Sequence, residues 1–304
     1  MKITNDRVIG LGDSLTNQLV SYRKERDFNP VEYINTKVAV INEYLAKHNL
    51  DTIVVASSGG VDSAVAAALS SLTTAKVKMV TVPCFDNDGV TRQEDTMHLS
   101  QELANSLGID LTVLEITGVV DAASHVIGDD GKSPWSVGQS VPYLRTAVVY
   151  SYISRLWEMG HRAIFMGTTN FDEGGYLGYI GKASDGMVDV QPISDIHKSE
   201  VYQVAHELNI PQSIIGAIPQ GDMYSGQSDE EVFGVSYDGV ELFMASKMGF
   251  EVPDCPVWEM VCERLEDMHT YNLHKYLGAS PAVHLDIIDN PPIEGGWITR
   301  NGVE

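Results

Sequence analysis

Residues 54–69 read VVASSGGVDSAVAAAL, in which small residues separate an apolar segment from a helix-forming one. The small residues and their neighbours are Ser57, Ser58, Gly59, Gly60, Val61, Asp62 and Ser63. Glycines let the backbone approach a ligand closely, and the N–H groups at a helix N-terminus bind anions. The stretch therefore predicts a strand, a phosphate-binding loop and a helix in succession, which is the arrangement of an α/β protein.

Asp62 distinguishes this loop from other nucleotide-binding loops. The sequence lacks the lysine and the spacing of the GxxxxGK[ST] loop, and it does not match GxGxxG. A carboxylate beside a phosphate is repulsive unless a cation lies between them, so Asp62 indicates Mg²⁺. The alternative is that Asp62 only caps the helix as an ordinary N-terminal acid. The whole pattern after a strand favours nucleotide binding.

Predicted strands and helices alternate along most of the chain. Strand patterns at 51–56, 76–83, 110–116 and 161–170 alternate with helical patterns, which cover 31–45, 62–72, 93–108, 141–160 and 194–211. The alternation predicts an α/β fold, a doubly wound parallel sheet with helices on both faces, in a single domain. Loops that follow parallel strands meet at one edge, so loops 57–63 and 167–173 should lie together.

The charge balance excludes several classes of partner. Acidic residues number 42 and basic residues 20, which gives a net charge of −22. Such a charge repels nucleic acid and anionic membranes, so we expect neither as a partner.

No apolar stretch reaches the roughly 20 residues that span a bilayer, and the first residues lack a signal-peptide pattern, so we expect a cytoplasmic protein. The three cysteines do not have the spacing of zinc ligands.

The hexapeptide 58–63 matches the SGGxDS signature of the ATP pyrophosphatases, and downstream segments narrow the choice. Residues 167–203, residues 228–243 and the pair His274–Lys275 together resemble the motifs of the NAD synthetases, in the same order. The resemblance runs from about Asn29 to about Lys275. It implies an adenine nucleotide alpha hydrolase-like fold, with residues 29–304 as the NAD synthetase domain and residues 1–28 as an N-terminal extension.

The resemblance implies the amidation of deamido-NAD with ATP as co-substrate. ATP adenylates the nicotinate carboxylate and releases pyrophosphate, and ammonia then displaces AMP. It implies that Asp62, Glu173 and Lys198 are catalytic and that Asp62 and Glu173 hold Mg²⁺. The implied ATP-binding residues are Ser57, Ser58, Gly59, Gly60, Val61, Asp62, Ser63, Thr168, Lys198 and Gln220. The implied deamido-NAD-binding residues are Arg145, Lys182, Asp189, His274 and Lys275.

Two positions depart from the pattern of many relatives. Arg145 stands alone where relatives carry two closely spaced arginines, and Gln220 stands where they often have Ser or Thr.

The alternatives to an ammonia-dependent synthetase are a glutamine-fed reaction through a partner, another SGGxDS enzyme such as a tRNA-modifying one, and a non-catalytic nucleotide sensor. Fewer than 60 residues precede Ser58 and none is Cys, so we expect ammonia as the nitrogen donor.

The helix predicted around 141–159 carries more apolar residues than one stripe against a sheet requires. They are Tyr143, Val148, Val149, Tyr150, Tyr152, Ile153, Leu156 and Trp157. A second subunit is one way to bury the outer face, and the C-terminal segment of the same chain is the other. The resemblance implies a homodimer with the dinucleotide site at the subunit interface, which is what we expect.

Overall fold

The structure is a computed structural model, and it describes residues 8–85, 94–128, 134–221, 227–275, 282–293 and 296. The strands are β1 (Thr52–Ala56), β2 (Lys76–Thr81), β3 (Leu111–Val113), β4 (Ala163–Met166), β5 (Val190–Gln191) and β6 (Val283–His284). The first helices are α1 (Asp13–Arg26), α2 (Pro30–Lys47), α3 (Val61–Ser71), α4 (Glu94–Leu107), α5 (Thr117–Ile127) and α6 (Pro134–Glu158). They are followed by η1 (Glu173–Leu177), α7 (Lys198–Glu207), α8 (Gln212–Ile215), α9 (Asp229–Phe233), α10 (Tyr237–Lys247), α11 (Pro256–Asn272) and η2 (Leu273–Lys275).

The strands form one sheet in the order β3-β2-β1-β4-β5-β6, and every pairing is parallel. In the central register, Thr52 of β1 pairs with Lys76 of β2 on one side and with Ala163 of β4 on the other. The chain thus winds outward from β1 in one direction and then from β4 in the other. The doubly wound parallel sheet is confirmed, and its topological switch point lies between β1 and β4.

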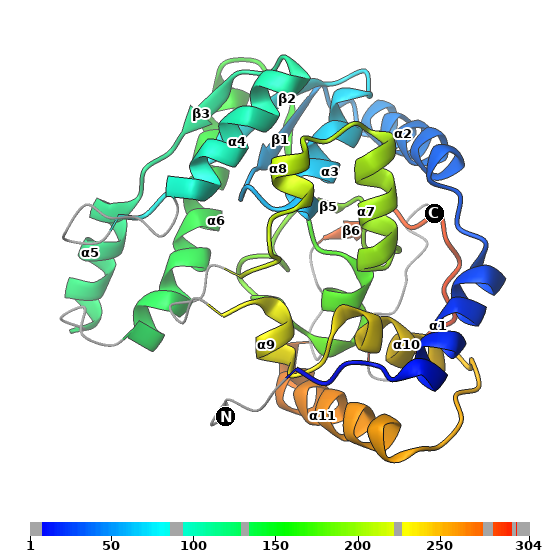
Figure 1. Ribbon diagram of the computed structural model, residues 1–304. Helices are drawn as coiled ribbons and strands as arrows, with labels where there is room; N and C mark the ends of the chain where they lie inside the picture. The colour runs from blue at the N-terminus through cyan, green and yellow to red at the C-terminus, as the bar shows by residue number, and fades with distance from the viewer. Residues whose placement is uncertain are drawn as a thin grey trace.

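Alternate residues of the strands point to opposite faces of the sheet, and helices cover both faces (Figure 1). On β1, Ile53 and Val55 pack in one apolar cluster, to which α2, α3, α4 and α7 contribute. Val54 packs in another, with residues of α5 and α6. Helices on both faces therefore bury the sheet, as the alternating sequence predicts.

A second apolar layer lies beyond the carboxyl edge of the sheet. It is built from α1, η1, α9, α10 and α11, which lie together in the lower part of Figure 1. Leu15, Leu19 and Tyr22 of α1 are buried in it, although the sequence analysis predicts no helix in this part of the chain. The N-terminal helix is therefore part of the packed structure.

Most helix and strand expectations hold in the structure. Asn29 caps α2 by accepting hydrogen bonds from the N–H groups of Val31 and Glu32, and Pro30 occupies the first turn. α6 begins at Pro134, seven positions before the predicted start at Val141. Among the described residues, no helix has both the length and the apolar character needed to cross a bilayer.

Candidate functional site

The glycine loop joins β1 to α3 at the switch point of the sheet. Gly59 has a φ of 83°, a left-handed conformation that favours glycine, and Gly60 is the N-cap of α3. The Ser58 N–H donates to Ser63 Oγ at 3.2 Å, and the Ser63 hydroxyl donates to the Gly60 carbonyl at 3.0 Å. The loop is therefore folded tightly against the N-terminus of an 11-residue helix, an arrangement that binds anions.

Two residues of the predicted loop have their side chains in other contacts. Val61 is buried in the apolar core beside the sheet. Ser57 is also buried, and its hydroxyl donates to Ser100 Oγ of α4 at 3.0 Å. Contacts from Ser57 and Val61 to a nucleotide would therefore come from their backbones.

Lys198 lies between the two acids expected to be catalytic. Its Nζ is 2.5 Å from Asp62 Oδ2 and 3.1 Å from Glu173 Oε1. Asp62 lies in the first turn of α3 after β1, Glu173 begins η1 after β4, and Lys198 begins α7, so three loops converge at this point. The side chains of Asp62 and Glu173 are 18% and 15% exposed, so both acids are partly buried. Tertiary contacts cover them.

Burial and mutual charge shift the proton affinities in this cluster. Burial raises the pKa of Glu173 to about 8, an effect that the Lys198 ammonium opposes and the Asp62 carboxylate reinforces. Burial alone would lower the pKa of Lys198, but the Asp62 and Glu173 carboxylates raise it above its ordinary value. Lys198 is therefore a cation at any physiological pH.

Three further residues hold the cluster in place. Asn170 donates through Nδ2 to Asp62 Oδ1 at 2.9 Å and accepts from the Glu173 N–H at 3.1 Å. The Tyr237 hydroxyl lies 2.9 Å from Glu173 Oε1 and 3.0 Å from Asp229 Oδ2. The sequence analysis did not assign roles to these residues. All three lie inside the segments GTTNFDE and SDEEVFGVSYD, so position within a motif was the available signal.

A pocket of about 170 Å³ opens beside the glycine loop. Its lining includes Ser58, Thr168 and Arg145, together with Thr81, Phe165 and Asp185. The Arg145 side chain is fixed by an Nε–H bond to the Val82 carbonyl at 2.9 Å, at the end of β2. The pocket therefore combines the predicted phosphate loop with a hydroxyl and a cation at the carboxyl edge of the sheet.

Lys182, His274 and Lys275 lie together although 92 positions separate the first two. The Lys182 Nζ lies 3.4 Å from the His274 carbonyl, and Lys275 donates to the Gly178 carbonyl at 2.8 Å. Burial lowers the pKa of Lys275. The structure thus brings basic residues of two separate segments together. The other two predicted cations lie near the glycine loop: Arg145 lines a pocket with Ser58, and Lys198 pairs with Asp62.

Asp189 and Gln220 occupy different surroundings. Asp189 accepts from the Phe165 N–H at 2.7 Å and from the Tyr150 hydroxyl at 3.1 Å, so its carboxylate links β4 to α6. Gln220 is exposed, between Pro219, whose carbonyl accepts from the Asp229 N–H, and Gly221, whose N–H donates to Asp229. The residues on either side of Gln220 therefore bond Asp229, whose carboxylate also lies 3.0 Å from the Tyr237 hydroxyl.

The sequence matches the NAD synthase family model over residues 33–277. The chain belongs to the NAD synthase family. Among curated relatives, the NH(3)-dependent NAD(+) synthetase of Methanococcoides burtonii is 31% identical over 214 residues, 69% of this chain and 74% of that protein. The protein of the same description from Methanoregula boonei is 35% identical over 191 residues, 62% of this chain and 72% of that protein.

Solved structures of the NAD synthase family and its neighbours share the fold. The NMN synthetase from Francisella tularensis has a TM-score of 0.71 at 27% identity, covering 83% of this chain and 98% of that one. The NH3-dependent NAD synthetase from Campylobacter jejuni has a TM-score of 0.64 at 19% identity, covering 82% and 96%. These likenesses confirm the single α/β nucleotide-binding domain.

The acid pair of this NAD synthase family protein fits a magnesium ion. One oxygen of Asp62 and one of Glu173 both bond the same ammonium, so the two carboxylates face a common point. A hard oxygen donor set of this kind is what Mg²⁺ prefers. Among the described residues, no group of three or more His, Cys, Asp or Glu side chains is arranged as a complete metal site. Water and phosphate oxygens would have to complete the coordination of a bound Mg²⁺, as is usual for this ion.

Proposed function

We propose that this protein is an ammonia-dependent NAD synthetase, a ligase that amidates deamido-NAD at the expense of ATP. The observation that carries the proposal is the convergence of Asp62, Glu173 and Lys198 beside the glycine loop, in a chain that matches the NAD synthase family along most of its length. Since the reaction consumes ATP, we expect it to take place in the cytoplasm.

The first step would join the nicotinate carboxylate to the α-phosphorus of ATP, and the bond to pyrophosphate would break. The glycine-loop N–H groups and the Ser58 and Thr168 hydroxyls would hold the phosphates, and the fact that Ser58 and Thr168 line one pocket supports this role. Lys198 would leave its carboxylate partners and bond the departing pyrophosphate as a point charge. Asp62 and Glu173 would hold Mg²⁺, which supplies charge neutralisation at the phosphates.

The second step would transfer the acyl group to ammonia with release of AMP. An acyl adenylate is already activated, so the protein needs to hold the two reactants in line and exclude water rather than provide a nucleophile. The burial of the acid cluster supports this role, since its groups act in a site of low dielectric constant. We propose Arg145, Lys182, Asp189, His274 and Lys275 as the contacts of the nicotinate substrate.

A second candidate function is synthesis of NMN from the corresponding mononucleotide acid. The observation that favours it is the likeness to the NMN synthetase from Francisella tularensis, at a TM-score of 0.71 and 27% identity. The chemistry at the carboxylate would be the same, and only the group beyond the ribose phosphate would differ. The single Arg145, where relatives carry two arginines, is compatible with a smaller substrate.

We further propose a homodimer that contacts through α6. The inner side of α6 packs against the sheet through Val149, Ile153 and Leu156, while Tyr143 and Trp157 are 40% and 44% exposed. On α5, which packs against α6, Val126 is 82% exposed. Exposed apolar residues on adjacent helices support burial by a second subunit.

One assay separates these functions. The purified protein is incubated with ATP and Mg²⁺, with deamido-NAD or nicotinic acid mononucleotide, and with ammonia or glutamine, and the products are identified by mass spectrometry. We expect NAD, AMP and pyrophosphate from deamido-NAD and ammonia. Preferred turnover of the mononucleotide would favour the second candidate. Efficient use of glutamine by the purified chain would contradict the ammonia assignment, and nucleotide binding without any product would indicate a sensor.

A further inference from the structure

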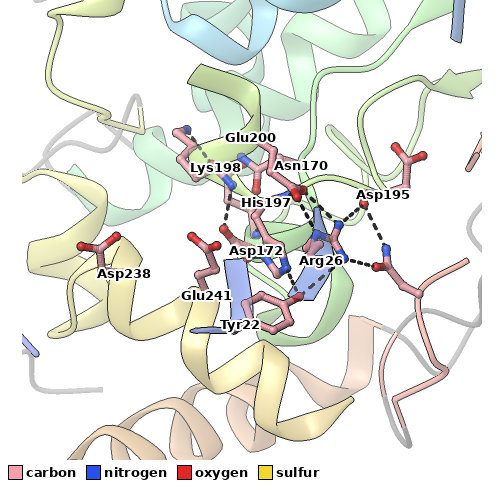
Figure 2. A network of polar contacts seen from close by, with 12 residues as sticks. Tyr22, Arg26, Asn170, Asp172, Asp195, His197, Lys198, Glu200, Asp238 and Glu241 are labelled. Carbon is pink, nitrogen blue, oxygen red and sulfur yellow. Dashed lines mark hydrogen bonds and ion pairs between the residues drawn. The ribbon is translucent and has the colours of Figure 1, made fainter. Parts of the chain in front are cut away.

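The start of α7 is held by a buried carboxylate that also adjoins the acid cluster. Asp172 Oδ2 accepts a hydrogen bond from the Lys198 N–H at 2.8 Å, and Asp172 Oδ1 lies 2.6 Å from His197 Nδ1 (Figure 2). The side chains of Asp172 and His197 are fully buried. Asp172 directly precedes Glu173, so one carboxylate connects the backbone positions of Glu173 and Lys198.

The N-terminal helix supplies the other partner of this histidine. Tyr22 of α1 places its hydroxyl 2.8 Å from His197 Nε2, across 175 positions of sequence. Arg26 Nη1 lies 3.5 Å from the same hydroxyl oxygen, which accepts from it. His197 Nδ1 donates to the Asp172 carboxylate, which fixes the orientation of the ring.

Arg26 secures the same turn of α7 from a second direction. Its guanidinium donates to both carboxylate oxygens of Glu200, at 2.5 Å and 3.0 Å, and to the Asp195 carbonyl at 3.1 Å. Glu200 in turn accepts from the His197 N–H at 2.9 Å. Arg26 of α1 and Glu200 of α7 are thus tied by charge-assisted bonds that are largely shielded from water.

We propose that Tyr22, His197 and Asp172 are positioning residues, which hold the first turn of α7 so that Lys198 stands opposite Asp62 and Glu173. The proposal rests on the proposed function for its kinetic consequence and assigns a role to the N-terminal helix. Tyr22 and His197 reach the acid cluster only through Asp172 and the backbone, so they act on the placement of Lys198 and not on a substrate.

The direction of the contacts argues against packing as their only purpose. Buried polar chains are costly unless every member is satisfied, and an apolar side chain at position 197 would fill the space without that requirement. The series of hydrogen bonds ends at Asp172. Its carboxylate accepts from the Lys198 N–H, and its backbone continues directly into Glu173, so it adjoins two members of the acid cluster. A displacement of a reacting group by about 1 Å can lower a rate by about a hundredfold, so this rigidity has catalytic value.

α1 also offers a matched control. Arg23, one turn before Arg26, bonds Glu241 at 2.6 Å and Asp238 at 2.7 Å, and both acids belong to α10. These bonds anchor the same helix but do not contact Asp172, His197 or Lys198 in any described interaction. Arg23→Gln should therefore loosen α1 without altering the first turn of α7.

The kinetic test uses Tyr22→Phe, His197→Asn and His197→Gln. The Asn amide can donate from a position near Nδ1 to Asp172, whereas the Gln amide matches Nε2 instead. We expect Tyr22→Phe to lower kcat about tenfold with little change in KM for ATP, and His197→Gln to lower it more than His197→Asn. Adding Tyr22→Phe to His197→Asn should cause no further loss, because Asn lacks the Nε2 position. Arg23→Gln should lower Tm and leave kcat unchanged.

A measurement without substrate separates this proposal from the proposed function. Amide hydrogen exchange of Lys198 should accelerate in Tyr22→Phe and His197→Gln but remain as in the natural sequence in Arg23→Gln. Natural protein that forms no amide would refute the synthetase function, and the exchange experiment would still test the positioning. Wild-type kcat and exchange in Tyr22→Phe, or equal kcat losses in Tyr22→Phe and Arg23→Gln, would overturn the proposal.

Discussion

The ammonium of Lys198 and the carboxylate of Asp62 lie 2.5 Å apart, although 136 positions separate them in the sequence. Asp62 stands at the start of α3 and Lys198 at the start of α7, so the pair joins two helix N-termini at the switch point of the sheet. The lysine neutralises acids that face one another. A phosphate group of a bound substrate would therefore replace the carboxylates of Asp62 and Glu173 as the partner of the Lys198 ammonium.

Substitution of either acid is the most direct test of the proposed metal site. We expect Asp62→Asn and Glu173→Gln each to lower kcat for ATP-dependent amidation by about a hundredfold or more, because charge neutralisation at the phosphates would be lost. Both changes keep the side-chain shape, so circular dichroism and Tm should show a folded protein. Unchanged turnover of either variant at saturating Mg²⁺ would remove that residue from the mechanism.

Lys198→Met should also be severe, but for a different reason. The variant removes the cation from between Asp62 and Glu173, so it leaves two buried carboxylates facing each other and takes a positive charge from the phosphates. We expect kcat to fall by about a hundredfold to a thousandfold. The control is Lys247→Met, since Lys247 pairs with Glu266 on α11 away from the acid cluster. Steady-state kinetics of both variants provide the comparison, and equal losses would refute a specific role for Lys198.

The pair Lys37–Asp195 is expected to govern stability rather than activity. Both side chains are fully buried, with Nζ 3.0 Å from the carboxylate, and Asp195 also accepts from the Ile287 N–H of the C-terminal segment at 2.7 Å. Lys37→Met would leave a buried charge unpaired, which costs about 3–5 kcal/mol. Urea unfolding should show this loss, while Lys24→Met, at an exposed position of α1, should change the free energy of unfolding by less than about 0.5 kcal/mol.

Asp286 should make stability depend on pH. Burial, assisted by the Asp195 charge, raises the pKa of Asp286 from 3.8 to about 6. The folded protein therefore binds this proton more tightly than the unfolded chain does. The contribution of Asp286 to the free energy of unfolding falls as the pH rises from about 4 to about 6 and stays low above that.

In the natural protein the Ser194 hydroxyl donates to Asp286 Oδ1 at 2.6 Å. Asp286→Asn removes the titrating group and keeps an oxygen that can accept this hydrogen bond. We expect the variant to be more stable than the natural protein by about 1–3 kcal/mol at about pH 8, with no difference near pH 4. His284, whose pKa burial lowers to about 4, has the opposite pH dependence, but it is present in both proteins and largely cancels. A stability difference that is constant between these pH values would contradict the assignment.

The proposed dimer predicts that assembly and activity fall together on dilution. Met159 follows α6 and is 64% exposed, so Met159→Glu should place a charge at the subunit contact and raise the dissociation constant at least about tenfold. Met260→Glu, at a 54% exposed position of α11, should not. Sedimentation and specific activity are measured across the same dilution series. A monomer with undiminished activity would contradict a shared site.

The sequence by itself determined the parallel sheet and the place of its ligand site. Hydrophobic periodicity and turn residues are local signals, so residues 51–72 specified strand, loop and helix without reference to the rest of the chain. The rule that parallel strands end at one edge then brought the loops carrying Asp62 and Glu173 together, and the structure has them 15–18% exposed around one lysine.

Only the tertiary structure decided how that site is held. The bonds of Asn170 to Asp62, Tyr237 to Glu173 and Tyr22 to His197 join residues 108, 64 and 175 positions apart. No periodicity encodes such pairs, because a polar side chain in a helix or loop has many possible partners until packing removes water and leaves one. The N-terminal helix shows the same limit: its few apolar residues, Leu15, Leu19 and Tyr22, give a weak local signal. Their role follows from the apolar cluster that they form with η1, α10 and α11, and that cluster exists only in the folded chain.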